Sequence, residues 1–310
     1  MRIRKPCAAQ TAGLGNIFSQ KNNKGEENET MKKILALVLV LIMALGLAAC
    51  AAPAAPAEEP TPAAEPETEK VDSQAILAEL KTPAEESNWE RTTSSQEVID
   101  FLKVVAEHSA GRIILDTTTF ATEAGTPIPY MIISDVAPAS PADVPEDKGV
   151  VYVNCNIHSG EIEGKESMMI FAREVAQGKH DDLLKDLVVI IVPNSNPDGN
   201  DNLGKNRITT QFTPKLVGTR AEGNGLNVNR DMTKLETACG RTIVKLMNDW
   251  NPILFIDAHA TDGSYMRHAV TYNWGLNAGT DAELLAYNRD VFCSRALREG
   301  SYLASKGKVA

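Results

Sequence analysis

Three short apolar runs dominate the middle of the chain. They cover residues 149–157, 187–192 and 253–256, are rich in β-branched residues and contain few polar side chains. Strands that helices cover on both faces have this composition, because no set of alternate positions faces water. The runs therefore predict three core strands of a largely parallel sheet.

Apolar residues also recur at helical spacing. The spacing from Val98 to Val105 predicts a helix over about 95–108. Ser94 and Glu97 match the pattern of a capping box, in which each side chain satisfies a backbone N–H of the other residue. This helix should therefore begin directly after Ser94.

Three further helices are predicted. Apolar stripes within 168–175 and 243–250 have helical spacing, and Pro252 ends the second because proline cannot continue a helix. A third helix is expected over about 282–299.

Two β-like runs, 112–119 and 128–134, precede the core strands and are joined across Gly125, which is typical of a hairpin. Strands that alternate with helices indicate an α/β fold. The predicted fold class is α/β, with a mixed, largely parallel central sheet and helices on both faces.

Each core strand runs directly into a polar cluster. In open α/β sheets, ligands bind outside the carboxyl ends of the strands. The clusters should therefore meet at one rim of the sheet. They are His158-Ser-Gly-Glu161, Asn194 to Gly199, and Asp257-Ala-His259.

His158 and Glu161 are separated by one tight turn, where Gly160 lets the chain bend without a Cβ penalty. The motif alone is weak, since His158 also fits a satisfied histidine at a strand end and Glu161 a carboxylate beside a helix N-terminus. His259 adds a third ligand at another strand end. Two imidazoles and one carboxylate, with a fourth position open to water, form a ligand set of catalytic zinc.

From about residue 88 to 310 the chain resembles the zinc metallocarboxypeptidase (carboxypeptidase A-like) family. Four motifs carry this resemblance in the family's order, and Arg91-Thr-Thr-Ser94 resembles the family's opening. The four motifs are His158-Ser-Gly-Glu161, Asn196-Pro-Asp-Gly199, the stretch from Arg220 to Asp231, and Asp257-Ala-His259.

The resemblance implies roles for six residues. Asn229 and Arg230 would bind the C-terminal carboxylate of a peptide substrate, because the arginine fork fits a carboxylate. Arg220 would polarise the scissile carbonyl and stabilise the oxyanion. The implied ligands of one Zn²⁺ ion are His158, Glu161 and His259.

Both arginines also have ordinary explanations. Arg230 and Asp231 fit a surface ion pair, and Arg220 fits a solvated arginine in a loop that also carries Lys205 and Arg207.

The resemblance further implies a general-base glutamate on a late strand, several dozen residues beyond the third ligand. The chain ends 310 − 259 = 51 residues after His259, and only Glu283 and Glu299 follow it, both on helical patterns where we expect solvated side chains. We therefore expect the general-base glutamate to be absent. Residues 71–310 would then be a partial catalytic domain, truncated at its C-terminus, with weakened metal binding and little or no turnover.

The N-terminal residues predict export. Residues 31–50 combine a basic start with a short apolar run, and their Leu-Ala-Ala-Cys end resembles a bacterial lipobox with Cys50 as the lipidated residue. A plain signal peptide with an incidental cysteine is the alternative. Residues 1–30 read as upstream sequence translated by mistake, and 51–70 as a disordered Ala/Pro/Glu tether. The expected location is outside the cytoplasm, lipid-anchored to the bacterial cell membrane.

The net charge of the chain limits the kinds of molecule that it could bind. The net charge is −10, and residues 1–50 contribute +4 from seven basic residues and three glutamates, so the remainder carries −14. Such acidity argues against nucleic acid as a partner, because its phosphates require basic contacts.

Cys155, Cys239 and Cys293 have no pairing spacing and are expected to be free, mostly buried thiols. Of the other histidines, we expect none of His108, His180 and His268 to bind the metal.

Three functions fit these features. The first is a zinc carboxypeptidase that removes the last residue of peptides or of cell-wall stem peptides. The second is a zinc amidohydrolase that deacylates N-acyl amino acids, whose free carboxylate would suit Asn229 and Arg230 equally well. The third is a non-catalytic, solute-binding lipoprotein, although such proteins need two lobes and the chain predicts only one sheet.

Overall fold

The computed structural model describes residues 72–208, 211–260, 273–275 and 277–295. The chain divides into two units between Glu69 and Lys70, and all described residues belong to the second unit. The predictions for 1–30, for 31–50 with Cys50, and for 51–70 lie outside the described residues. No helix among those described combines the length and apolarity that crossing a bilayer requires.

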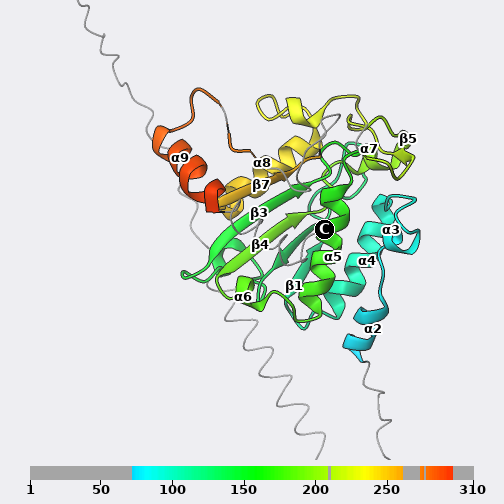
Figure 1. Ribbon diagram of the computed structural model, residues 1–310, viewed down its shortest axis with the longest axis horizontal. Helices are drawn as coiled ribbons and strands as arrows, with labels where there is room; N and C mark the ends of the chain where they lie inside the picture. Colours follow the sequence, from blue (N-terminus) through cyan, green and yellow to red (C-terminus); the bar gives the residue numbers. More distant parts are fainter. Residues whose placement is uncertain (1–71, 209–210, 261–272, 276, 296–310) are drawn as a thin grey trace, which may run out of the picture. The chain divides into compact units, whose positions relative to one another are not determined.

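The core is a five-stranded mixed sheet with the strand order β1-β2-β4-β3-β7 (Figure 1). Strand β3 runs parallel to both β4 and β7, whereas β1–β2 and β2–β4 are antiparallel pairs. The predicted fold class is therefore confirmed, and so is the hairpin, as β1 and β2. The strand bounds are Ile113–Asp116 (β1), Tyr130–Ile133 (β2), Gly149–Cys155 (β3), Leu187–Val192 (β4) and Leu254–Ala258 (β7).

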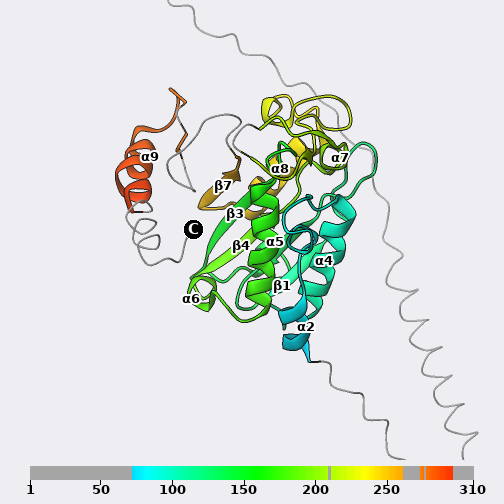
Figure 2. The ribbon, with the colours of Figure 1, turned by 45° about the vertical axis from the view of Figure 1, so that its right-hand side comes forward.

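Helices cover both faces of this sheet (Figures 1 and 2). Because strand side chains alternate between faces, Val151 and Val153 pack with α4 (Ser95–Glu107) and α5 (Glu163–Ala176). Tyr152 and Ile190 instead pack with α8 (Ala238–Trp250) on the opposite face. The near-continuous apolar runs of β3 and β4 are thus explained by burial on two sides.

The predicted helices are present. The capping box forms at the start of α4, where the Ser94 N–H donates to Glu97 Oε2 at 2.9 Å and Ser94 Oγ accepts from the Glu97 N–H. The predicted C-terminal helix begins with α9 (Ala282–Ala286) and continues as the π-helix η3 (Tyr287–Phe292). The shorter elements are α2 (Ser73–Glu79), α3 (Pro83–Glu86), α6 (Asp181–Leu184), α7 (Pro197–Asp201), β5 (Gly204–Lys205), β6 (Leu216–Val217), η1 (Pro141–Asp143) and η2 (Val228–Arg230).

One expectation about the core strands is wrong. Strand β7 lies at the edge of the described sheet, with only β3 beside it. Phe255 and Ile256 are consequently 37% and 42% exposed among the described residues, and are not covered on both faces. An apolar strand can be buried on both faces, but its composition does not ensure that neighbouring elements cover it.

A buried polar network fastens the segment before α4 to the start of α5. Glu166 accepts hydrogen bonds from Thr92 Oγ1 and from the backbone and hydroxyl of Thr93, at 2.7–2.9 Å. The fully buried Lys165 ammonium donates to Thr92 Oγ1 at 2.8 Å and to Asn200 Oδ1 at 2.7 Å. Buried charges require such pairing. The network fixes α5, which directly follows the His158–Glu161 turn.

The capping glutamate of α4 predicts a pH dependence of stability. The hydrogen bond from Arg91, together with those from the Ser94 backbone and hydroxyl, outweighs burial and lowers the pKa of Glu97 to about 2. Because this pKa is lower in the folded state, ionised Glu97 stabilises the fold fully above about pH 4.5, and the benefit is lost as the pH falls towards 2. Urea unfolding should therefore show Glu97→Gln to be less stable than wild type at pH 7.

That difference should shrink steadily below about pH 4.5. The control is Glu107→Gln, an exposed residue at the other end of α4 that has no ion pair with any described residue. A deficit of constant size from pH 7 to pH 2.5 would contradict the assignment.

Candidate active site

The polar clusters at the ends of β3, β4 and β7 meet at one rim, as predicted. Asn156 Nδ2 after β3 donates to Asn194 Oδ1 after β4 at 2.8 Å. The rings of His158 and His259, which follow β3 and β7, lie 4.9 Å apart between centroids in an edge-to-face arrangement. Residues far apart in sequence are thus placed together by parallel strand pairing.

The turn after β3 is held by backbone contacts. The Glu161 N–H donates to the His158 carbonyl at 2.8 Å. The expected reason for Gly160 is wrong, because its φ does not lie in the left-handed region. Instead, a Cβ at Gly160 would lie 3.2 Å from the Gly218 carbonyl oxygen, a tight contact, so the close approach of the 217–219 segment favours glycine.

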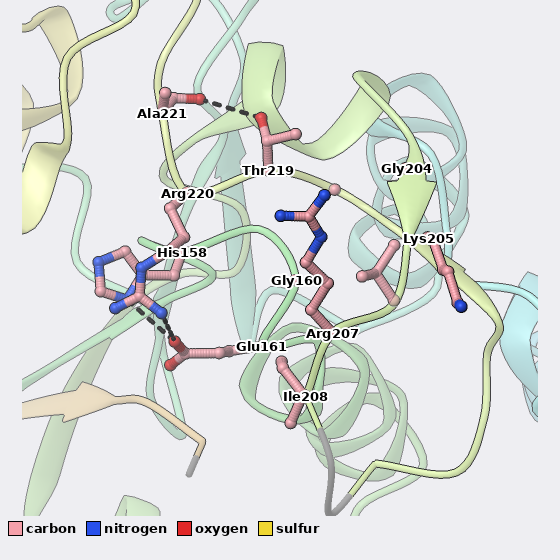
Figure 3. Close-up of a pocket in the computed structure, with 12 residues that line it drawn as sticks. His158, Gly160, Glu161, Gly204, Lys205, Arg207, Ile208, Thr219, Arg220 and Ala221 are labelled. Atoms are coloured by element: carbon pink, nitrogen blue, oxygen red, sulfur yellow. Dashed lines mark hydrogen bonds and ion pairs between the residues drawn. The ribbon is translucent and has the colours of Figure 1, made fainter. Parts of the chain in front are cut away.

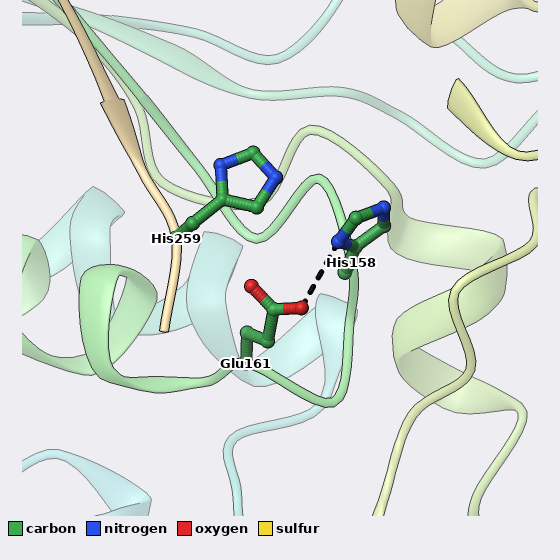
Figure 4. A group of neighbouring side chains, drawn as sticks. All are labelled: His158, Glu161 and His259. Carbon is green, nitrogen blue, oxygen red and sulfur yellow. Dashed lines mark hydrogen bonds and ion pairs between the residues drawn. The ribbon is translucent and has the colours of Figure 1, made fainter. Parts of the chain in front are cut away.

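His158, Glu161 and His259 form a compact cluster (Figure 4). One potential ligand atom from each residue lies within 4.8 Å of the other two, and His158 Nδ1 is 3.0 Å from Glu161 Oε1. His158 and Glu161 are buried, while His259 is exposed. Donors around a tetrahedral zinc lie roughly 3.4 Å apart, so the widest pair would have to close by up to about 1.4 Å.

The hydrogen bonds around His158 fit a cation at this point. Asn227 Oδ1 accepts from the Asn229 N–H at 3.0 Å, which fixes the orientation of the Asn227 amide. The same oxygen lies 3.1 Å from His158 Nε2 and can only accept, so this nitrogen carries a hydrogen. His158 Nδ1 then faces the Glu161 carboxylate at 3.0 Å. A proton or a metal ion between these two atoms would make the contact favourable.

His259 is oriented in a similar way by a carboxylate. Asp257 Oδ1 lies 3.1 Å from His259 Nδ1, and Asn229 Nδ2 lies 3.2 Å from His259 Nε2. A carboxylate behind a histidine is a common support for metal ligation, because it fixes the ring and its tautomer. The hydrogen bond to Asp257, partly opposed by burial, raises the pKa of His259.

Glu161 is held ionised despite its burial. Desolvation raises its pKa, but the hydrogen bonds from His158 and the Ala260 N–H, together with the two imidazoles, lower the pKa below its ordinary value. The Ala260 N–H donates to Oε2 at 3.0 Å, and Arg220 Nη1 donates to Oε1 at 3.1 Å. A carboxylate in this state is suited to bind a cation.

The predicted substrate residues lie on two sides of the cluster. Arg220 contacts Glu161, whereas Asn229 contacts His259 from η2. Arg230 is exposed and donates to the Asn229 carbonyl at 2.8 Å. Asp231 accepts hydrogen bonds from the backbone and hydroxyl of Thr237, so its carboxylate stabilises the start of α8. The alternative of an Arg230–Asp231 surface pair therefore gains no support.

The two other described histidines have partners outside the cluster. His108 caps α4 and lies 3.0 Å from Ser73 Oγ, and His180 lies 2.9 Å from Glu174 Oε2. His268 lies outside the described residues. Glu283 is exposed on α9, while Glu299 is not described. Cys155, Cys239 and Cys293 are buried, as predicted, and Cys155 and Cys239 are free thiols.

Sequence reasoning assigned no role to Asn227 or Asp257, and it missed the Ala260 N–H. Asn227 stands two residues before Asn229, the spacing at which an asparagine side chain accepts from the backbone N–H of the second residue after it, as it does here. Asp257 stands two residues before His259 at the end of a strand, where alternate side chains share one face. These two spacings were the features of the sequence from which the supporting roles of Asn227 and Asp257 could have been predicted.

A cavity of about 620 Å³ opens beside the cluster (Figure 3). His158 and Glu161 form one wall, and the hairpin of β5 and β6 with the following segment forms the other. The hairpin wall consists of Gly204, Lys205, Arg207, Ile208, Val217, Gly218, Thr219, Arg220 and Ala221. Its polar members are mainly cationic.

The cluster could hold a metal ion, and the comparison with protein families indicates its class. Residues 101–243 match the family model for zinc carboxypeptidase, a span that includes His158, Glu161, Asn229 and Arg230. This match confirms the resemblance to zinc carboxypeptidases over that segment. The family binds zinc, and the His/Glu/His cluster is the possible place for it here.

Solved structures similar to the chain include three proteins. A metallo-carboxypeptidase from Burkholderia cenocepacia is 19% identical, with a TM-score of 0.42, covering 55% of this chain and 42% of its own. Carboxypeptidase A from Helicoverpa armigera is 16% identical, with a TM-score of 0.39 and coverages of 60% and 50%.

The third is bovine thrombin-activatable fibrinolysis inhibitor in complex with tick carboxypeptidase inhibitor. It is 16% identical, with a TM-score of 0.46 and coverages of 68% and 75%. This chain thus spans less than half the length of the Burkholderia enzyme. No curated protein matches it.

Asn227 provides a test of this geometry. Asn227→Ala removes the acceptor that orients the His158 ring, so the zinc affinity should fall about 10- to 100-fold, measured by competition with a chromophoric chelator. His158→Ala should abolish binding at the cluster.

Asn248→Ala, at an exposed position on α8, is the matched control and should bind zinc like wild type. An unchanged affinity for Asn227→Ala, with an unchanged melting temperature, would show that His158 does not depend on Asn227.

Proposed function

We propose that the chain is the metal-binding part of a zinc carboxypeptidase that hydrolyses the C-terminal bond of peptides or of cell-wall stem peptides. The observation that carries this proposal is the cluster of His158, Glu161 and His259 at the carboxyl rim of the sheet, in a chain whose residues 101–243 match the zinc carboxypeptidase model. When bound, the zinc would polarise the scissile carbonyl and lower the pKa of a water molecule.

The surrounding residues suit the remaining tasks. The Arg220 guanidinium stands 3.1 Å from Glu161 and can stabilise negative charge that develops on the carbonyl oxygen. Asn229 and Arg230 lie on the His259 side, where an arginine fork can bind the terminal carboxylate of a substrate. The free carboxylate is the feature that separates a carboxypeptidase substrate from an internal peptide.

A pair of peptides tests this function. N-Acetyl-Gly-Ala-Leu and its C-terminal amide differ only in the carboxylate, so the zinc-loaded protein should bind the acid about tenfold or more tightly. Arg230→Gln should remove most of this preference, while Arg241→Gln, an exposed arginine on α8, should not. Affinity is measured by calorimetry and products by mass spectrometry.

The products separate the alternatives. Free leucine supports carboxypeptidase action, release of acetate supports an amidohydrolase, and binding without product supports a solute-binding role. Equal affinity for the acid and the amide would contradict the proposal.

We also propose that Cys50 carries a lipid and that residues 51–70 tether the domain outside the cytoplasm. The support is the basic, apolar and Leu-Ala-Ala-Cys sequence of residues 31–50. In a bacterial host, the full chain should fractionate with membranes and Cys50→Ser should not, as judged by immunoblot. Cys155→Ser, a buried cysteine of the domain, is the control. Membrane retention of Cys50→Ser would contradict lipidation at this residue.

A further inference from the structure

The β5–β6 hairpin carries a local positive charge in an acidic chain. Residues 202–221 contain Lys205, Arg207, Lys215 and Arg220 but no aspartate or glutamate, although the chain has a net charge of −10. Three of these four cations line the cavity beside the metal cluster, and only Lys215 does not (Figure 3). The positive charge is therefore concentrated where a substrate would lie.

This hairpin is fastened to the turn that carries His158 and Glu161. Asn206 Nδ2 donates to the carbonyls of Gln211 and Pro214 at 3.2 and 2.9 Å and so closes the hairpin. Gln211 Nε2 then donates to the Gly160 carbonyl at 3.2 Å, and the Ser159 N–H donates to the Thr219 carbonyl at the same distance. The cations on the hairpin are thus held at a defined position beside the metal ligands.

Arg207 is the cation best placed to meet a ligand. Its side chain is exposed and lies between Arg220 and β5 in Figure 3. Arg220 already contacts Glu161, whereas neither Arg207 nor Lys205 has an ion pair within the described part of the chain. An arginine that lines a cavity without a carboxylate partner is suited to bind one from a ligand, bidentately.

The position of the cavity indicates which part of a substrate it would meet. The residues proposed to bind the terminal carboxylate, Asn229 and Arg230, do not line this cavity, and Asn229 contacts His259 instead. The cavity touches the cluster from the side of His158 and Glu161. If the departing C-terminal residue lies on the Arg230 side, the residue that supplies the scissile carbonyl extends towards the hairpin.

We propose that Arg207, assisted by Lys205, forms a subsite for a carboxylate side chain on the residue that precedes the scissile bond. The enzyme would thereby prefer substrates with an acidic penultimate residue. This inference rests on the proposed carboxypeptidase function and adds a substrate class to it.

Three peptides test the subsite in the zinc-loaded protein: N-acetyl-Gly-Glu-Leu, N-acetyl-Gly-Gln-Leu and N-acetyl-Gly-Lys-Leu. Affinity is measured as Kd by calorimetry, and as kcat/KM where a peptide is hydrolysed. The glutamate peptide should bind roughly 5- to 10-fold more tightly than the glutamine peptide, as expected for a partly exposed charge-assisted contact. The lysine peptide should bind most weakly.

Arg207→Gln should abolish the preference for glutamate and leave the affinity for the glutamine peptide unchanged. Lys215→Gln is the matched control, since it removes the same charge from the same hairpin outside the cavity, and it should keep the preference. Equal loss in both variants would overturn the subsite in favour of a general charge effect. A preference that survives Arg207→Gln, or is absent from the wild type, would also overturn it.

A second pair of peptides, N-acetyl-Gly-Leu-Glu and N-acetyl-Gly-Leu-Gln, tests whether the subsite instead binds the side chain of the departing residue. A preference for glutamate in this pair that depends on Arg207 would place the subsite on the departing residue and overturn the assignment made here. Failure of the proposed function gives a different result, namely no zinc-dependent binding of any of these peptides, in which case the subsite is overturned with it.

Discussion

The parallel pairing of β3 with β7 is the constraint on which the site depends. Cys155 pairs with Ala258, so the two strands end at the same level of the sheet. The chain then needs three residues to reach His158 and one to reach His259. Because side chains alternate along a strand, a slip of one residue in this register would turn His259 towards the opposite face and separate it from His158 and Glu161.

Glu161 joins the parts that this register brings together. Its carboxylate contacts His158 in its own turn, Arg220 after β6 and the backbone of Ala260 after β7. Each contact stabilises the ionised form, and together they offset the desolvation that burial imposes. A group that cross-links three segments and remains charged is costly to bury, and a cation at the cluster would offset that cost.

The regular elements could be predicted from sequence because their signals are local. The capping box at Ser94 and Glu97, the apolar runs of β3 and β4, and the stripe of α8 each depend on periodicity or on one known cap. The rim was predicted for a topological reason, since parallel strands share their carboxyl edge. The grouping of His158, Glu161 and His259 followed from that edge and from the family resemblance.

The remaining features depend on contacts that no local pattern encodes. The reason for Gly160 is the approach of Gly218 from a segment about sixty residues later, and the support from Asn227 and Gln211 comes from irregular backbone. The exposure of β7 depends on what lies beside it and not on its composition. The cationic charge of the hairpin is visible in sequence, but its direction towards the cavity required the structure.

The most direct test of the account is X-ray absorption at the zinc edge of protein reconstituted with one equivalent of zinc. The cluster predicts two imidazole ligands and otherwise oxygen donors, with no sulfur, because none of the described cysteines belongs to it. A spectrum with sulfur ligands, or with fewer than two imidazoles, would show that His158, Glu161 and His259 do not share one ion.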